Sequence, residues 1–258
     1  MPHTHRKKNP SPNKRLQVTD DTGWTHVTTG GPRARRVLRS TSDQILPAEA
    51  PAALTLPDLQ SQLTAHQRRW AASTTAGIVR DTLRRVLGSS SCSTPLNIVC
   101  IGLGSPSGFL RGGWVDRRSV SMYQLAALLT VIEECRASDS STPVPVYAQD
   151  PVFNALDESL LAALGVTVVQ HPRAFDEVSA RTVLFCPGAE RAHLEQLLRA
   201  DDQIPAMLFG GPLEDTESDI ISQFARARQS VRLPRFEEQE HAFWNMRVYY
   251  PQETSGET

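Results

Sequence analysis

Residues 96–105 read Leu-Asn-Ile-Val-Cys-Ile-Gly-Leu-Gly-Ser, an apolar run that ends directly in a glycine turn. A continuous hydrophobic run is typical of a strand that is buried on both faces, as strands of parallel sheets are. Glycines directly after such a strand let the backbone turn sharply and approach a ligand closely. Because ligands bind at the carboxyl ends of strands in open α/β sheets, this turn predicts the place of a binding site.

Strand-like and helix-like segments alternate after this run. Short apolar runs predict four further strands, at residues 144–147, 166–169, 181–186 and 204–209. Amphipathic periodicity predicts the helices between them, at residues 119–135, from Asn154 or Asp157 to 164, 194–198 and 214–228. This alternation indicates an α/β fold, a three-layer Rossmann-like domain with a mostly parallel sheet of about five strands flanked by helices.

The segments on either side extend this domain. Helical periodicity covers residues 56–87, where Thr55 with Asp58 is an N-terminal signal and Gly77 is expected to divide the segment into two helices. Aromatic residues after position 231 predict a last helix and an edge strand packed on the body. We therefore expect a disordered basic tail over 1–54, the α/β domain over 55–250 and a flexible C-terminus over 251–258.

Composition excludes several classes of protein. The 258 residues are 40% hydrophobic and 21% charged, as in an ordinary globular protein, and no apolar run approaches the ~20 residues that span a bilayer. No membrane partner is therefore expected. A disulfide framework or a zinc site is disfavoured, and a cytoplasmic or nuclear location is expected, because the four cysteines are widely spaced, at Cys92, Cys100, Cys135 and Cys186.

Charge is unevenly distributed along the chain. Residues 1–40 hold nine Lys/Arg and two Asp/Glu, a net charge of +7, so the rest of the chain carries −8 of the overall −1. A basic tail on an acidic body is compatible with nucleic-acid contact or with a nuclear-import signal. The plainer interpretation is a solvated tail, because the charges are scattered among Pro, Ser, Thr and Gly.

The glycine turn is the basis of one functional hypothesis, a nucleotide or S-adenosylmethionine pocket. Gly102 and Gly104 would let the backbone approach the ligand, Asp150 would bind ribose hydroxyls, and further polar contacts would come from Ser105, Ser107 and Gln124. The spacing departs from a dinucleotide site, because Asp150 lies 46 residues beyond Gly104 where ~20 are typical. In the alternative, the glycines only form a tight turn and Asp150 caps the turn that follows it.

Other chemistry has little support in the sequence. His171, His193 and His241 are too far apart in the chain to indicate a metal site. No P-loop motif and no Gly-x-Ser-x-Gly motif occurs, which argues against a P-loop ATPase and an α/β-hydrolase. We therefore predict no catalytic residue and no metal ligand.

Three pieces of the chain, in order, resemble the sensitivity-to-red-light-reduced family, whose shared region is called the SRR-like domain. They are residues 98–105 with 121–129, residues 146–153 with 160–165, and residues 182–187. The resemblance covers about residues 90–212, and the basic N-terminal tail resembles that of fungal members. It implies a regulatory protein that binds other proteins, with family links to circadian and light signalling, regulation of haem synthesis and cytoskeletal stability. It implies no established catalytic mechanism.

Two strand ends depart from the family pattern. Where the family has Pro-His-Cys after the fourth strand, this chain has Pro187-Gly188-Ala189. Where it has Gly-Asn-Ser after the fifth strand, this chain has Gly210-Gly211-Pro212. The resemblance therefore implies a divergent member, and Pro187 and Gly210 join the candidate binding residues because they mark these two strand ends.

Overall fold

The computed structural model describes residues 15–19, 25–29, 46–89, 95–109, 117–138, 143–199, 204–214 and 216–252. The chain forms two compact units, residues 1–45 and residues 46–258. In the first unit, Arg15–Thr19 (β1) pairs antiparallel with Thr25–Thr29 (β2). The rest of residues 1–45, and residues 253–258, lie outside the described residues, so the disordered tail and the flexible C-terminus stay predictions.

A mostly parallel sheet of seven strands organises the second unit, in the order β5-β4-β3-β6-β7-β9-β8. The strands are Asn97–Ile101 (β3), Val146–Gln149 (β4), Thr167–Val168 (β5), Thr182–Cys186 (β6), Met207–Gly210 (β7), Arg228–Arg232 (β8) and Arg247–Pro251 (β9). β3 to β7 are the five predicted strands and pair in parallel, which confirms the α/β class. The prediction of about five strands was too low, because β9 and β8 add an antiparallel edge.

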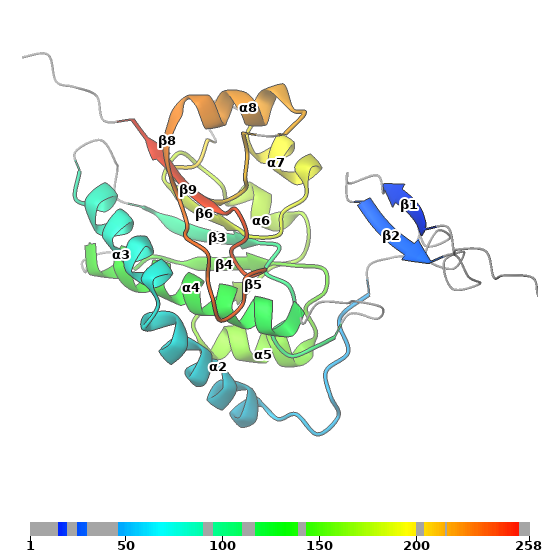
Figure 1. Ribbon diagram of the computed structural model, residues 1–258. Helices are drawn as coiled ribbons and strands as arrows, with labels where there is room; N and C mark the ends of the chain where they lie inside the picture. Colours follow the sequence, from blue (N-terminus) through cyan, green and yellow to red (C-terminus); the bar gives the residue numbers. More distant parts are fainter. Residues whose placement is uncertain are drawn as a thin grey trace, which may run out of the picture. The chain divides into compact units, whose positions relative to one another are not determined.

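Helices cover both faces of this sheet (Figure 1). They are Leu56–Ala71 (α2), Thr74–Leu87 (α3), Arg117–Ser138 (α4), Ala155–Ala163 (α5), Arg173–Asp176 (α6), Arg191–Leu197 (α7) and Asp219–Arg226 (α8). Successive β3 side chains alternate between two cores, Ile98 and Cys100 packing with α2 to α5, and Val99 and Ile101 with α6 to α8. No helix in the described ranges is long and apolar enough to cross a membrane.

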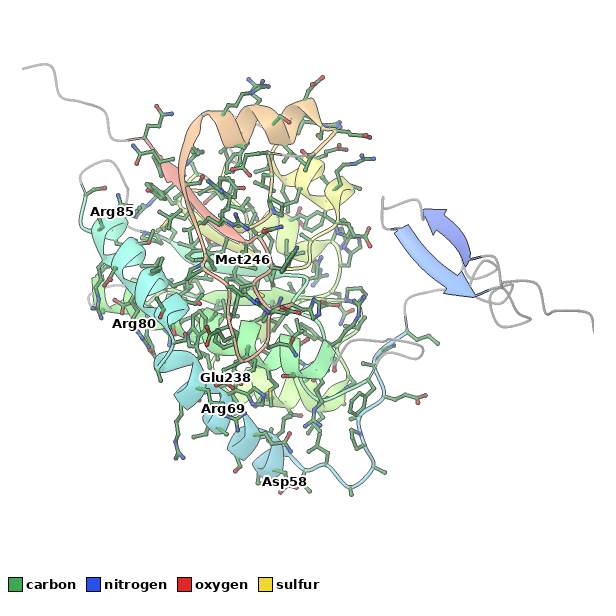
Figure 2. The ribbon with its side chains drawn as sticks, in the orientation of Figure 1. Asp58, Arg69, Arg80, Arg85, Glu238 and Met246 are labelled. Carbon is green, nitrogen blue, oxygen red and sulfur yellow. The ribbon has the colours of Figure 1, made fainter. Side chains whose placement is uncertain are left out.

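Local capping decides where the first two helices begin. The Thr55 hydroxyl accepts from the Asp58 N–H (3.4 Å), and the Asp58 carboxylate, labelled in Figure 2, accepts from the Thr55 N–H (3.2 Å). The second helix begins after Ser73, whose hydroxyl accepts from the Ala76 N–H (3.1 Å). The prediction that Gly77 divides the segment was wrong, since Gly77 lies inside α3, where one glycine costs only ~1 kcal/mol.

The chain between β8 and β9 differs from the prediction. Residues 233–246 form loops and turns rather than a last helix. α8 is shorter than the predicted 214–228, because it begins only at Asp219 and β8 already begins at residue 228. Aromatic packing fixes these turns, with the Trp70 ring centroid 4.9 Å from that of Phe243 and 5.8 Å from that of Phe236. The predicted edge strand is present as β9, but its neighbour β8 lies at the edge.

Candidate functional site

The carboxyl ends of β3 and β6 form the switch point of the parallel sheet, because β4 and β5 lie on one side and β7 lies on the other. A ligand crevice is expected at such a point. Here the loops that follow the two strands are in close contact. Gly102 has φ +75°, and a Cβ on it would lie 2.5 Å from the carbonyl carbon of Gly188. A Cβ on Gly188 would in turn lie 2.6 Å from the Gly102 oxygen, so both positions need glycine.

Asp150 connects the loops that follow β3 and β4. Its Oδ2 accepts from the Gly104 N–H (2.7 Å) and its Oδ1 from the Val152 N–H (3.0 Å). Burial raises the pKa of the Asp150 carboxyl, and these two hydrogen bonds act in the opposite direction. The bond to Val152 confirms the turn-capping interpretation, while a contact with a ribose stays a prediction.

A buried polar cluster lies beside this connection. Asp157 is fully buried and accepts from the Ser105 hydroxyl (2.6 Å), the Ser107 N–H (2.9 Å) and the Asn154 N–H (3.1 Å). The Asn154 amide donates to the Ser107 hydroxyl (2.9 Å) and to the Ala48 carbonyl (3.0 Å). Ser105, predicted as a ligand contact, therefore bonds to the start of α5.

The remaining candidate residues do not join this cluster. Gln124 is buried on α4 and donates to the Ala242 carbonyl (2.8 Å). Gly210 ends β7, with β6 between it and β3, and a Cβ on it would lie 2.8 Å from the Cys186 sulfur. Pro187 is half-buried beside Gly188. Of the predicted set, the structure thus brings together the residues of the β3 loop and Asp150.

Two histidines that are distant in the sequence lie close together in the structure. The rings of His171 and His193 have centroids 5.6 Å apart, and both contact Phe175. The Gln149 Oε1 accepts from the Ala174 N–H (3.0 Å), so its Nε2 donates to the His171 Nδ1 (3.0 Å). Neutral His171 then carries its hydrogen on Nε2. His171 and His193 are 22 residues apart in the chain, so the sequence gives no signal that their rings lie close together.

The described residues contain no candidate metal site. Within the described ranges, no group of three or more His, Cys, Asp or Glu side chains is placed to hold a metal ion. The two strand cysteines, Cys100 and Cys186, are buried, and burial raises the pKa of Cys100 and brings that of Cys186 to about 12. Their thiols therefore stay protonated at neutral pH.

A comparison with protein families shows to which family the chain belongs. The sequence model of the SRR1 domain matches residues 59–250, which is most of the chain. The chain belongs to the SRR1 domain family. The match extends beyond residues 90–212, the region of the resemblance, and takes in α3 and most of α2 and β9. No curated protein matches the chain.

The geometry of this SRR1 domain explains its two unusual loop ends. Gly188 stands where a larger side chain would collide with the Gly102 oxygen, as described above. Gly211 has φ +88°, and a Cβ on it would lie 3.0 Å from the Tyr249 hydroxyl, which accepts from the Leu213 N–H (3.0 Å). At both strand ends the chain packs against itself where a polar side chain had been expected from the resemblance.

Proposed function

We propose that this SRR1 domain is a non-catalytic binding module of a regulatory protein, acting in the cytoplasm or the nucleus. The observation that supports the proposal most is at the switch point, where the backbones of Gly102 and Gly188 are in close contact. The polar groups beside it support it too. Asp150, Ser105 and Asp157 each bond to groups of this chain.

Partner proteins are the ligands that this proposal requires, and the basic N-terminal segment provides a second surface for them. Its charge of +7 over residues 1–40 favours an acidic partner or nucleic acid. Affinity capture with the full chain and with a chain that lacks residues 1–45 separates the two surfaces. The truncation ends at 45 because Ala48 bonds to Val152 in the domain. Partners lost on truncation belong to the segment, and partners retained belong to the domain.

The second candidate function is nucleotide or S-adenosylmethionine binding in a Rossmann-like site, including a methyltransferase-like activity. The left-handed glycines of the β3 loop favour it, because Gly102 and Gly104 have φ of +75° and +73°. Native mass spectrometry of the purified full chain distinguishes the candidates. The binding-module proposal predicts the mass of the bare chain. A nucleotide or S-adenosylmethionine released in stoichiometric amount would overturn it in favour of the ligand site.

A further inference from the structure

A dipeptide from the segment before α2, Ala48 with Glu49, is held by all four of its backbone polar groups. The Ala48 N–H donates to the Val152 carbonyl (2.8 Å), and the Ala48 carbonyl accepts from the Asn154 amide (3.0 Å). The Glu49 N–H donates to the Phe109 carbonyl (3.3 Å), and the Phe109 N–H donates to the Glu49 carbonyl (3.0 Å). We call Ala48 and Glu49 the strap.

The strap lies across two loops at the carboxyl edge of the sheet. Phe109 follows β3, whereas Val152 and Asn154 follow β4. Glu49 pairs with Phe109 as an antiparallel bridge, so the strap is bound in the manner of a short added strand. The loops recognise its backbone, as proteins that bind extended peptides do. We call Gly108, Phe109, Val152 and Asn154 the strap groove.

The strap groove accepts only a small side chain at the position of Ala48. Ala48 is 5% exposed, and a Cβ on Gly108 would lie 2.6 Å from the Ala48 Cβ. The residues on either side of the strap are less buried than Ala48. Leu46 is 72% exposed, and Pro47 and Pro51 are exposed too. The two prolines favour extended backbone on either side, which suits the bound form.

We propose that the strap groove binds an extended segment of a partner protein with a small residue at its centre, and that the strap occupies the groove in its absence. The strap itself is the argument for this occupant. It shows that the groove satisfies an extended backbone completely and limits one side chain to about the size of alanine. This inference rests on the proposed function, because it names the partner class and the regulation of the binding module.

The strap and the partner segment compete for the strap groove, and this competition regulates partner binding. A tethered segment faces its own site at an effective concentration of about millimolar, so a free peptide at micromolar concentration does not displace it. Release of the strap opens the groove to the partner. A partner segment that already binds elsewhere on the chain competes on equal terms, because it too is tethered.

A peptide that copies the strap tests this on the full chain. The probe is fluorescent Ile-Leu-Pro-Ala-Glu-Ala-Pro-Ala, the sequence of residues 45–52, followed by fluorescence anisotropy. Ala48→Arg cannot fit beside Gly108 and releases the strap, while Ala52→Arg changes an exposed residue outside it and is the matched control. We expect at least about tenfold tighter binding to Ala48→Arg than to the wild type or the control. A probe with leucine at the Ala48 position should bind about tenfold more weakly.

Hydrogen exchange at Phe109 provides the second measurement, because its N–H donates to the strap. It should lose protection in Ala48→Arg and regain it with the peptide. Retained protection in Ala48→Arg, or lost protection without peptide binding, would overturn the proposal. If Ala48→Arg does not fold, Glu49→Pro decides by the same two readouts, since it removes one strap donor. Partners captured by the domain while the peptide fails would overturn the strap proposal alone and leave the binding module standing.

Discussion

Replacing Asp157 with alanine should lower the free energy of unfolding by about 3–4 kcal/mol. The side chain is fully buried and accepts three hydrogen bonds, from the Ser105 hydroxyl and from the N–H groups of Ser107 and Asn154. Alanine leaves all three donors without this acceptor. Ser107 is itself fully buried, so its N–H cannot turn to water instead.

The magnitude follows from these donors. A buried donor left unsatisfied costs about 1–3 kcal/mol, and the Ser107 and Asn154 N–H groups supply most of the loss. For a domain of this size, each kcal/mol shifts the melting temperature by about 2–4 °C, so a fall of about 10 °C is expected. Asp157→Asn keeps one acceptor oxygen and should lose about half as much.

Urea unfolding followed by tryptophan fluorescence measures the loss, since Trp70 is buried and reports on the core. Glu158→Ala is the matched control, because Glu158 is the exposed next residue in the first turn of α5. It should change stability by less than about 0.5 kcal/mol. Equal unfolding midpoints for Asp157→Ala and Glu158→Ala would refute the assignment of Asp157 as the anchor of the β3 loop.

Three further changes test the loops and the surface. Gly102→Ala should cost about 2–3 kcal/mol in urea unfolding, because its φ is +75° and the Cβ meets backbone, whereas Gly77→Ala has open space and should be neutral or stabilising by up to ~1 kcal/mol. Burial raises the pKa of Asp150 above 3.8, so the folded state favours the protonated carboxyl. The contribution of this carboxyl to stability is therefore present below pH 3.8 and is lost as the pH rises through the raised pKa. Wild-type stability relative to Asp150→Asn should therefore fall as the pH rises above 3.8, and a difference that stays constant with pH would contradict this. Arg84→Ala, which breaks a 2.8 Å pair with Glu134 on a side chain that is 63% exposed, should lower the melting temperature only slightly, and less still at high salt.

The central strands could be predicted from sequence because each is a buried apolar run. All five residues of β3 and of β6 are buried, and such runs are visible without a partner. The edge strand β8 was missed for the opposite reason. Its sequence Arg-Gln-Ser-Val-Arg holds one apolar residue, and none of its residues is fully buried, so only its pairing with β9 makes it a strand.

The candidate site was predictable in its position but not in its bonding. The sequence placed Gly102, Gly104 and Asp150 correctly at adjacent strand ends. It gave no means of finding that Ser105 and Asp157 bond to each other, because they are 52 residues apart. Asn154 and Asp157 were visible only as alternative helix starts, and they are in fact the two halves of one capping box.

Two places at the carboxyl edge of the sheet are occupied by the chain itself, and they differ in how they could open. The contact of Gly102 with Gly188 joins the turns that follow β3 and β6, so separating them would move the ends of two central strands. The strap is an extended dipeptide with exposed flanks, and its hydrogen bonds can be replaced one for one by another extended backbone. Exchange is therefore much less costly at the strap groove than at the switch point. This difference is why we assign partner binding to the loops after β3 and β4.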